Sequence, residues 1–175
     1  MKHPQIKKLS AAALLSALCF VVMYLGALTG VMDLCSAVFA SVVTAIAVIE
    51  LRGAWPWLMG AVTGVLCLLL LPDKFMALEY IALGALYPII KAYAESLRPA
   101  LSWALKLLSL NVLLTACFLC GRYLLGITEN WVKLNVIVYI LANVFFVFLD
   151  YALTVFITYY VQRLRPRLKI GSFLK

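Results

Sequence analysis

Long apolar runs separated by short polar breaks constrain the fold of this chain more than any other feature. The runs cover residues 9–29, 32–51, 54–71, 75–92, 99–125 and 134–161. Each approaches or exceeds the ~20 residues that a helix needs to cross a bilayer. They are continuously apolar, without the alternation that marks the strands of a membrane β-barrel. The sequence therefore predicts an all-α integral membrane bundle of six transmembrane helices, forming a single domain over residues 1–175.

Composition agrees with this prediction and leaves little room for an enzyme. The chain has 175 residues, of which 66% are hydrophobic and 13% are charged, whereas soluble domains carry about 25% charged residues. The only histidine is His3, and the Cys117-x-x-Cys120 pair has no second pair to complete a metal site. There is no phosphate loop and no Ser-His-Asp set. We expect no catalytic residues, no cofactor and no metal.

The basic residues predict the orientation of the bundle, because cytoplasmic loops carry an excess of Lys and Arg. With the N-terminus inside, the outer segments hold only Lys74, Arg122 and Lys133 of the 15 basic residues. The inner segments hold the others: Lys2, Lys7, Lys8, Arg52, Lys91, Arg98, Lys106, Arg163, Arg165, Arg167, Lys169 and Lys175. An even number of helices then puts both ends in the cytoplasm. The positive charge indicates contact with the lipid bilayer, and its dispersal over loops argues against a nucleic-acid partner.

The sixth run carries a polar stripe. Asn135, Tyr139, Asn143 and Asp150 recur at steps that place them on one face of a helix. Polar residues inside a membrane face the bundle interior and often mark a substrate path. Asn135, Tyr139 and Asn143 are therefore candidates for the polar wall of a substrate cavity. The alternative is that they hold neighbouring helices together by hydrogen bonds.

Asp150 falls in the inner half of the sixth run, and Lys106 falls at a similar depth in the fifth. We predict that the two form a buried charge pair with a structural or coupling role, because either charge alone would cost several kcal/mol to bury.

The outer end of the fourth run carries Glu79 and Tyr80, and Trp131 precedes the sixth run on the same side. A carboxylate and an indole at the outer end of the bundle suit a cationic or polar heterocycle. The carboxylate would attract its charge, and the indole would stack on its ring. Alternatively, Glu79 is an interfacial carboxylate paired with Lys74 or Lys133, and Trp131 is an anchor in the aromatic belt.

Small residues recur four apart in the Gly26-x-x-x-Gly30 and Gly60-x-x-x-Gly64 motifs, which permit close helix contact. A further smooth stripe, Ala13-x-x-x-Ala17, lies near the cytoplasmic end of the first run. Packing within the bundle explains such stripes as well as contact with a partner does.

The layout resembles the substrate-binding S components of energy-coupling factor (ECF) vitamin transporters of the bacterial cytoplasmic membrane. The resemblance rests on the basic Lys7-Lys8 tail, the alanine-rich stretch 11–17, the six spans, the Arg-Gly-Ala-Trp-Pro-Trp sequence at 52–57 and the basic C-terminus. It implies that Ala13 and Ala17 match the family's motif for docking on a transmembrane coupling subunit, which works with two ATPase subunits. It also implies a vitamin site toward the outer side. Where that family has a lid loop after the first helix, this chain has only a short turn at 29–32.

Two classes of function follow from these patterns. In the first, the chain captures a small vitamin-like solute from outside, through Glu79, Tyr80, Trp131, Asn135, Tyr139 and Asn143. In the second, it is a non-transport membrane scaffold or assembly protein of bacterial type, without a solvent-reachable cavity around these residues. The substrate stays open, since Glu79 favours a cationic or neutral heterocycle, whereas Lys133 or Arg122 could receive a carboxylate.

Overall fold

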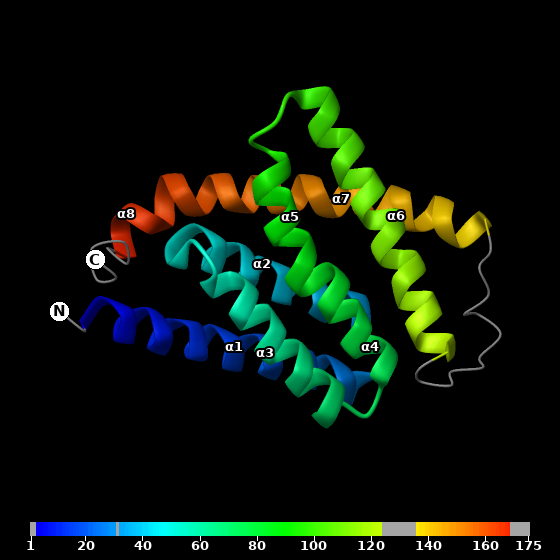
Figure 1. The fold of residues 1–175 in the computed structure, drawn as a ribbon, viewed down its shortest axis with the longest axis horizontal. Coiled ribbons are helices and arrows are strands. Elements are labelled where there is room, and N and C mark those ends of the chain that lie inside the picture. The colour runs from blue at the N-terminus through cyan, green and yellow to red at the C-terminus, as the bar shows by residue number, and fades with distance from the viewer. Residues whose placement is uncertain (1–2, 31, 124–135, 169–175) are drawn as a thin grey trace.

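The computed structural model describes residues 3–30, 32–123 and 136–168, and all regular secondary structure in them is helical (Figure 1). The elements in chain order are α1 (His3–Thr29), α2 (Asp33–Leu51), α3 (Trp55–Leu70), α4 (Lys74–Glu79), η1 (Tyr80–Leu86), α5 (Tyr87–Ala94), α6 (Pro99–Tyr123), α7 (Val136–Tyr159), η3 (Tyr160–Leu164) and α8 (Arg165–Leu168). The segments η1 and η3 are π-helical, and each joins its neighbours into one longer helix. The all-helical fold predicted from the apolar runs is confirmed for this part of the chain.

Among the described residues, five helices are long and apolar enough to cross a membrane: Gln5–Thr29, Asp33–Leu51, Lys74–Ala94, Pro99–Tyr123 and Val136–Arg167. The sixth apolar helix, α3, has 16 residues and rises only about 24 Å, somewhat less than the ~30 Å hydrocarbon core. The predicted ends at 124–125 and 134–135 lie outside the described residues. The described helices are thus those of a multi-pass membrane protein, and the predicted crossing at 54–71 stays a prediction.

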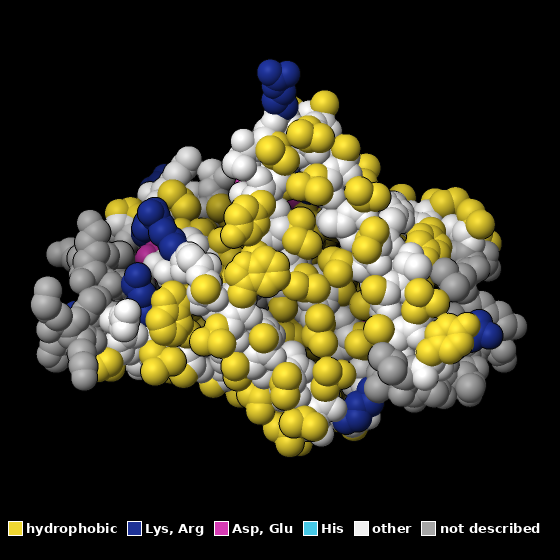
Figure 2. Space-filling view, in the orientation of Figure 1, with side chains coloured by type: hydrophobic (Ala, Val, Ile, Leu, Met, Phe, Trp, Pro, Cys, Tyr) yellow, Lys and Arg dark blue, Asp and Glu magenta, His cyan; other side chains and the backbone are white. Residues whose placement is uncertain are grey.

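The surface has the character expected of a protein solvated by lipid. Hydrophobic side chains cover most of the face in Figure 2, and Lys and Arg gather toward its edges. Large apolar residues on different helices are well exposed, among them Leu14, Leu108 and Phe148. Exposing so much apolar surface is unfavourable in water and costs nothing in a bilayer.

Contacts between helix ends show which ends lie together. A Cβ built on Gly26 would stand 2.6 Å from Ser36 and 2.9 Å from Met76, so the end of α1 meets the starts of α2 and α4. At the opposite end of α2, Glu50 Oε1 lies 3.0 Å from Arg165 Nε. The start of α1, the end of α2 and α8 therefore share one end of the molecule (Figure 1).

The first core lies between α1, α2, α3 and η1, and small residues make it tight. Cβ atoms built on Gly60 and Gly64 would meet Ala85 and Ile81 of η1, each at 3.1 Å. This motif serves close packing inside the bundle. Of the first glycine motif only Gly26 packs against a helix, whereas Gly30 has a φ of 65° and lies in the turn after α1.

The π-helical segment η1 immediately precedes Pro88. Proline lacks a backbone N–H, and its ring clashes with the carbonyl of the preceding turn. The helix widens before it: the Tyr87 N–H donates to the Ala82 carbonyl, five residues back. The extra residue in the π-helical turn changes the rotation of α5 relative to α4, so the two helices direct their side chains toward different neighbours.

The second core is smaller and joins α5, α6 and α7. Its fully buried apolar members are Tyr87, Leu110, Phe146, Leu149 and Leu153. Only about a fifth of each of the spans α6 and Val136–Arg167 is buried, 22% in both. These two helices therefore rely on a few specific contacts.

Candidate functional site

A large apolar cavity, open on one side, lies between α4, η1, α6 and the first half of α7, and Leu141, Phe145 and Phe148 of its lining are exposed. Its volume is about 690 Å³, within the range of small-molecule sites. Its walls include the apolar side chains of Leu34, Phe75, Leu113, Leu114, Phe118, Leu141 and Phe145. The start of α2, the start of α4, the end of α6 and the first half of α7 bound it, so it lies nearer the end of the bundle predicted to face outward.

Among the described residues that line this cavity, Glu79 is the one ionisable carboxylate. Its Oε2 atom is buried and accepts no hydrogen bond from any described residue. Lys74, one of the partners considered for it, instead donates from Nζ to the Leu71 carbonyl at 2.8 Å. Lys133, the other, lies outside the described residues. Glu79 is half-buried, and a buried carboxylate oxygen without a partner is costly, which makes Glu79 the strongest functional candidate in the cavity.

Tyr80, although adjacent to Glu79, does not line the cavity. Neighbouring residues in a helix point about 100° apart, and Tyr80 is fully buried in the first core with Met76 and Ala77. Gly84 makes room for its ring, since a Cβ there would stand 2.6 Å from Tyr80 Cδ2. The structure therefore separates these two predicted site residues.

Tyr139 and Asn143 project from α7 toward α6. The amides of Asn143 and Asn111 are paired reciprocally, with Nδ2 to Oδ1 distances of 3.1 and 3.2 Å. The Tyr139 hydroxyl lies 2.8 Å from Thr115 Oγ1. Both side chains thus hydrogen-bond between helices, which is the second of the two roles considered for them. Trp131 and Asn135 lie outside the described residues.

Asp150 lies at the centre of a buried charge cluster at the other end of the second core. Lys106 Nζ is 3.1 Å from Asp150 Oδ2, so the two side chains paired from the sequence are in contact. The other carboxylate oxygen, Oδ1, accepts from Lys91 Nζ and from the Tyr87 hydroxyl. Glu95 completes the cluster, 2.8 Å from Lys91 and 3.5 Å from Lys106, with its side chain 40% exposed.

The sequence analysis missed Tyr87, Lys91 and Glu95 as members of this cluster. Lys91 was counted only among the inner basic residues, yet its side chain is 1% exposed and also donates to Thr154 Oγ1 at 2.7 Å. Tyr87, Lys91 and Glu95 follow each other at steps of four, the spacing of one helix face. That spacing is the sequence signal that could have identified the three residues as one group.

Small residues on neighbouring faces of α1 have opposite environments. Ala12 and Ser16 are buried against the first core, whereas Ala13 and Ala17 are exposed. Ala13 and Ala17 therefore take no part in packing among the described residues and leave a smooth outer face on α1.

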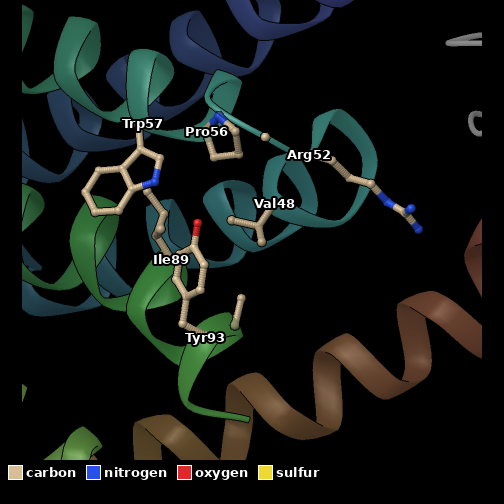
Figure 3. Close-up of a pocket in the computed structure, with 8 residues that line it drawn as sticks. Val48, Arg52, Pro56, Trp57, Ile89 and Tyr93 are labelled. Atoms are coloured by element: carbon tan, nitrogen blue, oxygen red, sulfur yellow. The ribbon is translucent and has the colours of Figure 1, made fainter. Parts of the chain in front are cut away.

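A shallow groove of about 190 Å³ lies at the other end of the bundle, between the end of α2, the start of α3 and α5. In Figure 3 the Trp57 and Tyr93 rings border it, and the Arg52 side chain extends away from it. Trp57 and Tyr93 are exposed, as is typical of aromatic residues at a membrane–water interface. The groove offers no converging polar groups to a ligand.

Among the described residues, no three His, Cys, Asp or Glu side chains come together in a way that could hold a metal ion. No family model, no curated protein and no solved structure matches this chain. The chemistry of the cavity and of the charge cluster therefore carries the functional argument.

Replacing Asp150 with Asn should destabilise the folded protein, because Lys91 and Lys106 would keep their buried charges opposite Glu95 alone. We expect a loss of about 3–5 kcal/mol in the free energy of unfolding, measured by denaturation in mixed micelles. Adding Lys106→Met should recover part of the loss, since Lys91 then keeps Glu95 as a balancing partner. Asp73→Asn, at an exposed turn, is the matched control and should change little. Wild-type stability of the Asp150→Asn protein would contradict this account of the cluster.

The Asn111–Asn143 pair should contribute a measurable coupling between α6 and α7. In a double-mutant cycle with Asn111→Leu and Asn143→Leu, unfolding free energies should deviate from additivity by about 0.6–1.7 kcal/mol, because each amide bonds the other. Strict additivity would show that the two amides act independently, and it would reopen Asn143 as a cavity residue.

Proposed function

We propose that this chain is the substrate-capture subunit of an ECF-type uptake transporter in the bacterial cytoplasmic membrane. It binds a small vitamin-like solute from the outer side and docks on a transmembrane coupling subunit that works with two ATPase subunits. It is not itself an enzyme and needs no cofactor. The observation that carries the proposal is the 690 Å³ cavity, which holds a buried carboxylate oxygen without a partner at Glu79.

The proposal includes six crossings with both ends in the cytoplasm. The short helix α3 joins the end of α2 to the start of α4, and these lie at opposite ends of the bundle, because the start of α4 meets the start of α2 near Gly26. This arrangement supports a crossing by α3 despite its 16 residues. The position of α8 beside Glu50, at the end where α1 begins, supports termini on one side.

The cavity is the observation that separates this function from the alternative, a membrane scaffold or assembly protein. A scaffold needs no cavity at Glu79, so the cavity favours capture. The hydrogen bonds that Tyr139 and Asn143 make with α6 are what a scaffold would use, but they equally hold the wall of a binding site in place. A substrate role for Trp131, Asn135, Tyr139 and Asn143 stays a prediction.

The exposed face of α1 is the proposed docking surface. Ala13 and Ala17 lie on it one turn apart and present no bulk, so a partner helix can approach the α1 backbone closely. The cavity lies at the other end of the bundle from the start of α1. Docking and solute capture can therefore be disturbed separately.

Replacing Ala13 with Trp should prevent assembly with the coupling subunit and leave solute binding intact, because the indole blocks close approach without touching the cavity. Assembly is measured by co-purification after co-expression with a coupling subunit and its two ATPases. Solute binding is measured by mass spectrometry of small molecules retained by the purified chain. Leu18→Trp is the matched control: Leu18 is also exposed on α1, about 140° around the helix from Ala13.

Both Trp variants should retain the same small molecule, and only Ala13→Trp should lose the partner. Failure of the wild-type chain to co-purify with any coupling subunit, together with the absence of a retained small molecule, would sink the capture function and favour the scaffold.

A further inference from the structure

We infer that the cavity selects an organic monocation with an apolar, flat body. The inference rests on the proposed capture function and narrows its substrate class. It starts from the juxtaposition of one unpaired carboxylate and a wall that is otherwise almost wholly apolar. The sequence alone left cationic, neutral and carboxylated solutes open, and the geometry of the cavity separates them.

The charge of the ligand follows from Glu79. Its Oε2 atom is buried and accepts no hydrogen bond from a described residue, and neither Lys nor Arg is among the described residues that line the cavity. Of the described basic residues near this end, Lys74 bonds the Leu71 carbonyl and Arg122 lies over the Tyr123 ring. A positively charged group on the ligand would supply the partner that Glu79 lacks, whereas a carboxylate would meet repulsion.

The surroundings of Glu79 add to this preference. Asp33 at the start of α2 and Asp73 in the turn before α4 repel a negative charge on Glu79. A cation bound beside Glu79 would offset this repulsion.

The body of the ligand follows from the walls. Phenylalanine and leucine side chains dominate the lining, with Phe118 and Phe145 on opposite helices, α6 and α7. Such surfaces favour a flat or aromatic group, and the face of a phenylalanine ring also attracts a cation. A bare metal ion is disfavoured, because only Glu79 offers a carboxylate among the lining residues that the structure describes.

A matched set of probes tests the inference on the full-length chain in lipid nanodiscs. The probes are N-methylquinolinium, its uncharged analogue 1-methylnaphthalene and the anion 1-naphthoate. Binding is measured by equilibrium dialysis against empty nanodiscs. The wild-type chain should bind the cation most tightly, and Glu79→Gln should weaken cation binding by about tenfold or more. The same variant should bind 1-methylnaphthalene as the wild type does, which shows that the cavity is intact.

Two further variants test whether the effect is specific to the Glu79 carboxylate and whether the probes bind inside the cavity. Asp73→Asn removes a nearby exposed carboxylate outside the lining and should weaken the cation much less than Glu79→Gln does. Ala142→Phe adds bulk to a lining position and should weaken both the cation and the neutral probe.

Equal binding of cation and neutral analogue, unchanged by Glu79→Gln, would overturn the inference and identify a purely apolar cavity of the kind that takes an acyl chain. Tighter binding of the anion, or binding of none of the probes, would overturn it as well. Failure of the capture function is distinguishable, because it appears as loss of assembly with the coupling subunit while the cation still binds.

Discussion

A buried aspartate held between two lysines is the interaction on which the arrangement of α5, α6 and α7 depends. One carboxylate oxygen of Asp150 accepts hydrogen bonds from Lys91 and from the Tyr87 hydroxyl, and the other oxygen accepts one from Lys106. Lipid supplies no hydrophobic drive for helices to associate, so packing and polar contacts must hold them. Because α6 and α7 bury little apolar surface, this cluster and the Asn111–Asn143 pair carry much of their association. Glu95, at the edge of the cluster, brings the charges into balance.

The same arrangement leaves the cavity. Where α6 and α7 diverge from η1, side chains of the second core form its floor: Leu110, Phe146 and Leu149 belong to both. Phe146 packs edge-on against Tyr87, with ring centroids 4.7 Å apart, and Tyr87 in turn donates to Asp150. A fixed charge cluster thus lies beneath a roomy apolar site. Rigid support of this kind preorganises a binding site and lowers the entropic cost of capture.

The helices could be predicted from the sequence because hydrophobic length is a local property. The depth of Lys106 and Asp150 along their helices also sufficed to bring them together. The parts that could not be predicted depend on how helices rotate about their axes. The π-helical turn at Tyr80–Leu86 changes the rotation of α5 relative to α4, and Lys91 and Tyr87 of α5 face Asp150. From the sequence, Asn143 could either line the cavity or hydrogen-bond to α6. Only the position of Asn111 in the structure distinguishes these two roles.

The orientation of the bundle is the most direct test of the central claim, since capture from outside requires the cavity to lie at the outer end. In a cysteine-free background, Pro72→Cys marks the turn before α4 and Ser96→Cys marks the turn after α5, and both positions are exposed. A membrane-impermeant maleimide added to intact cells should label Pro72→Cys at once and Ser96→Cys only after permeabilisation. The reverse pattern would put the cavity nearer the cytoplasm and contradict the account.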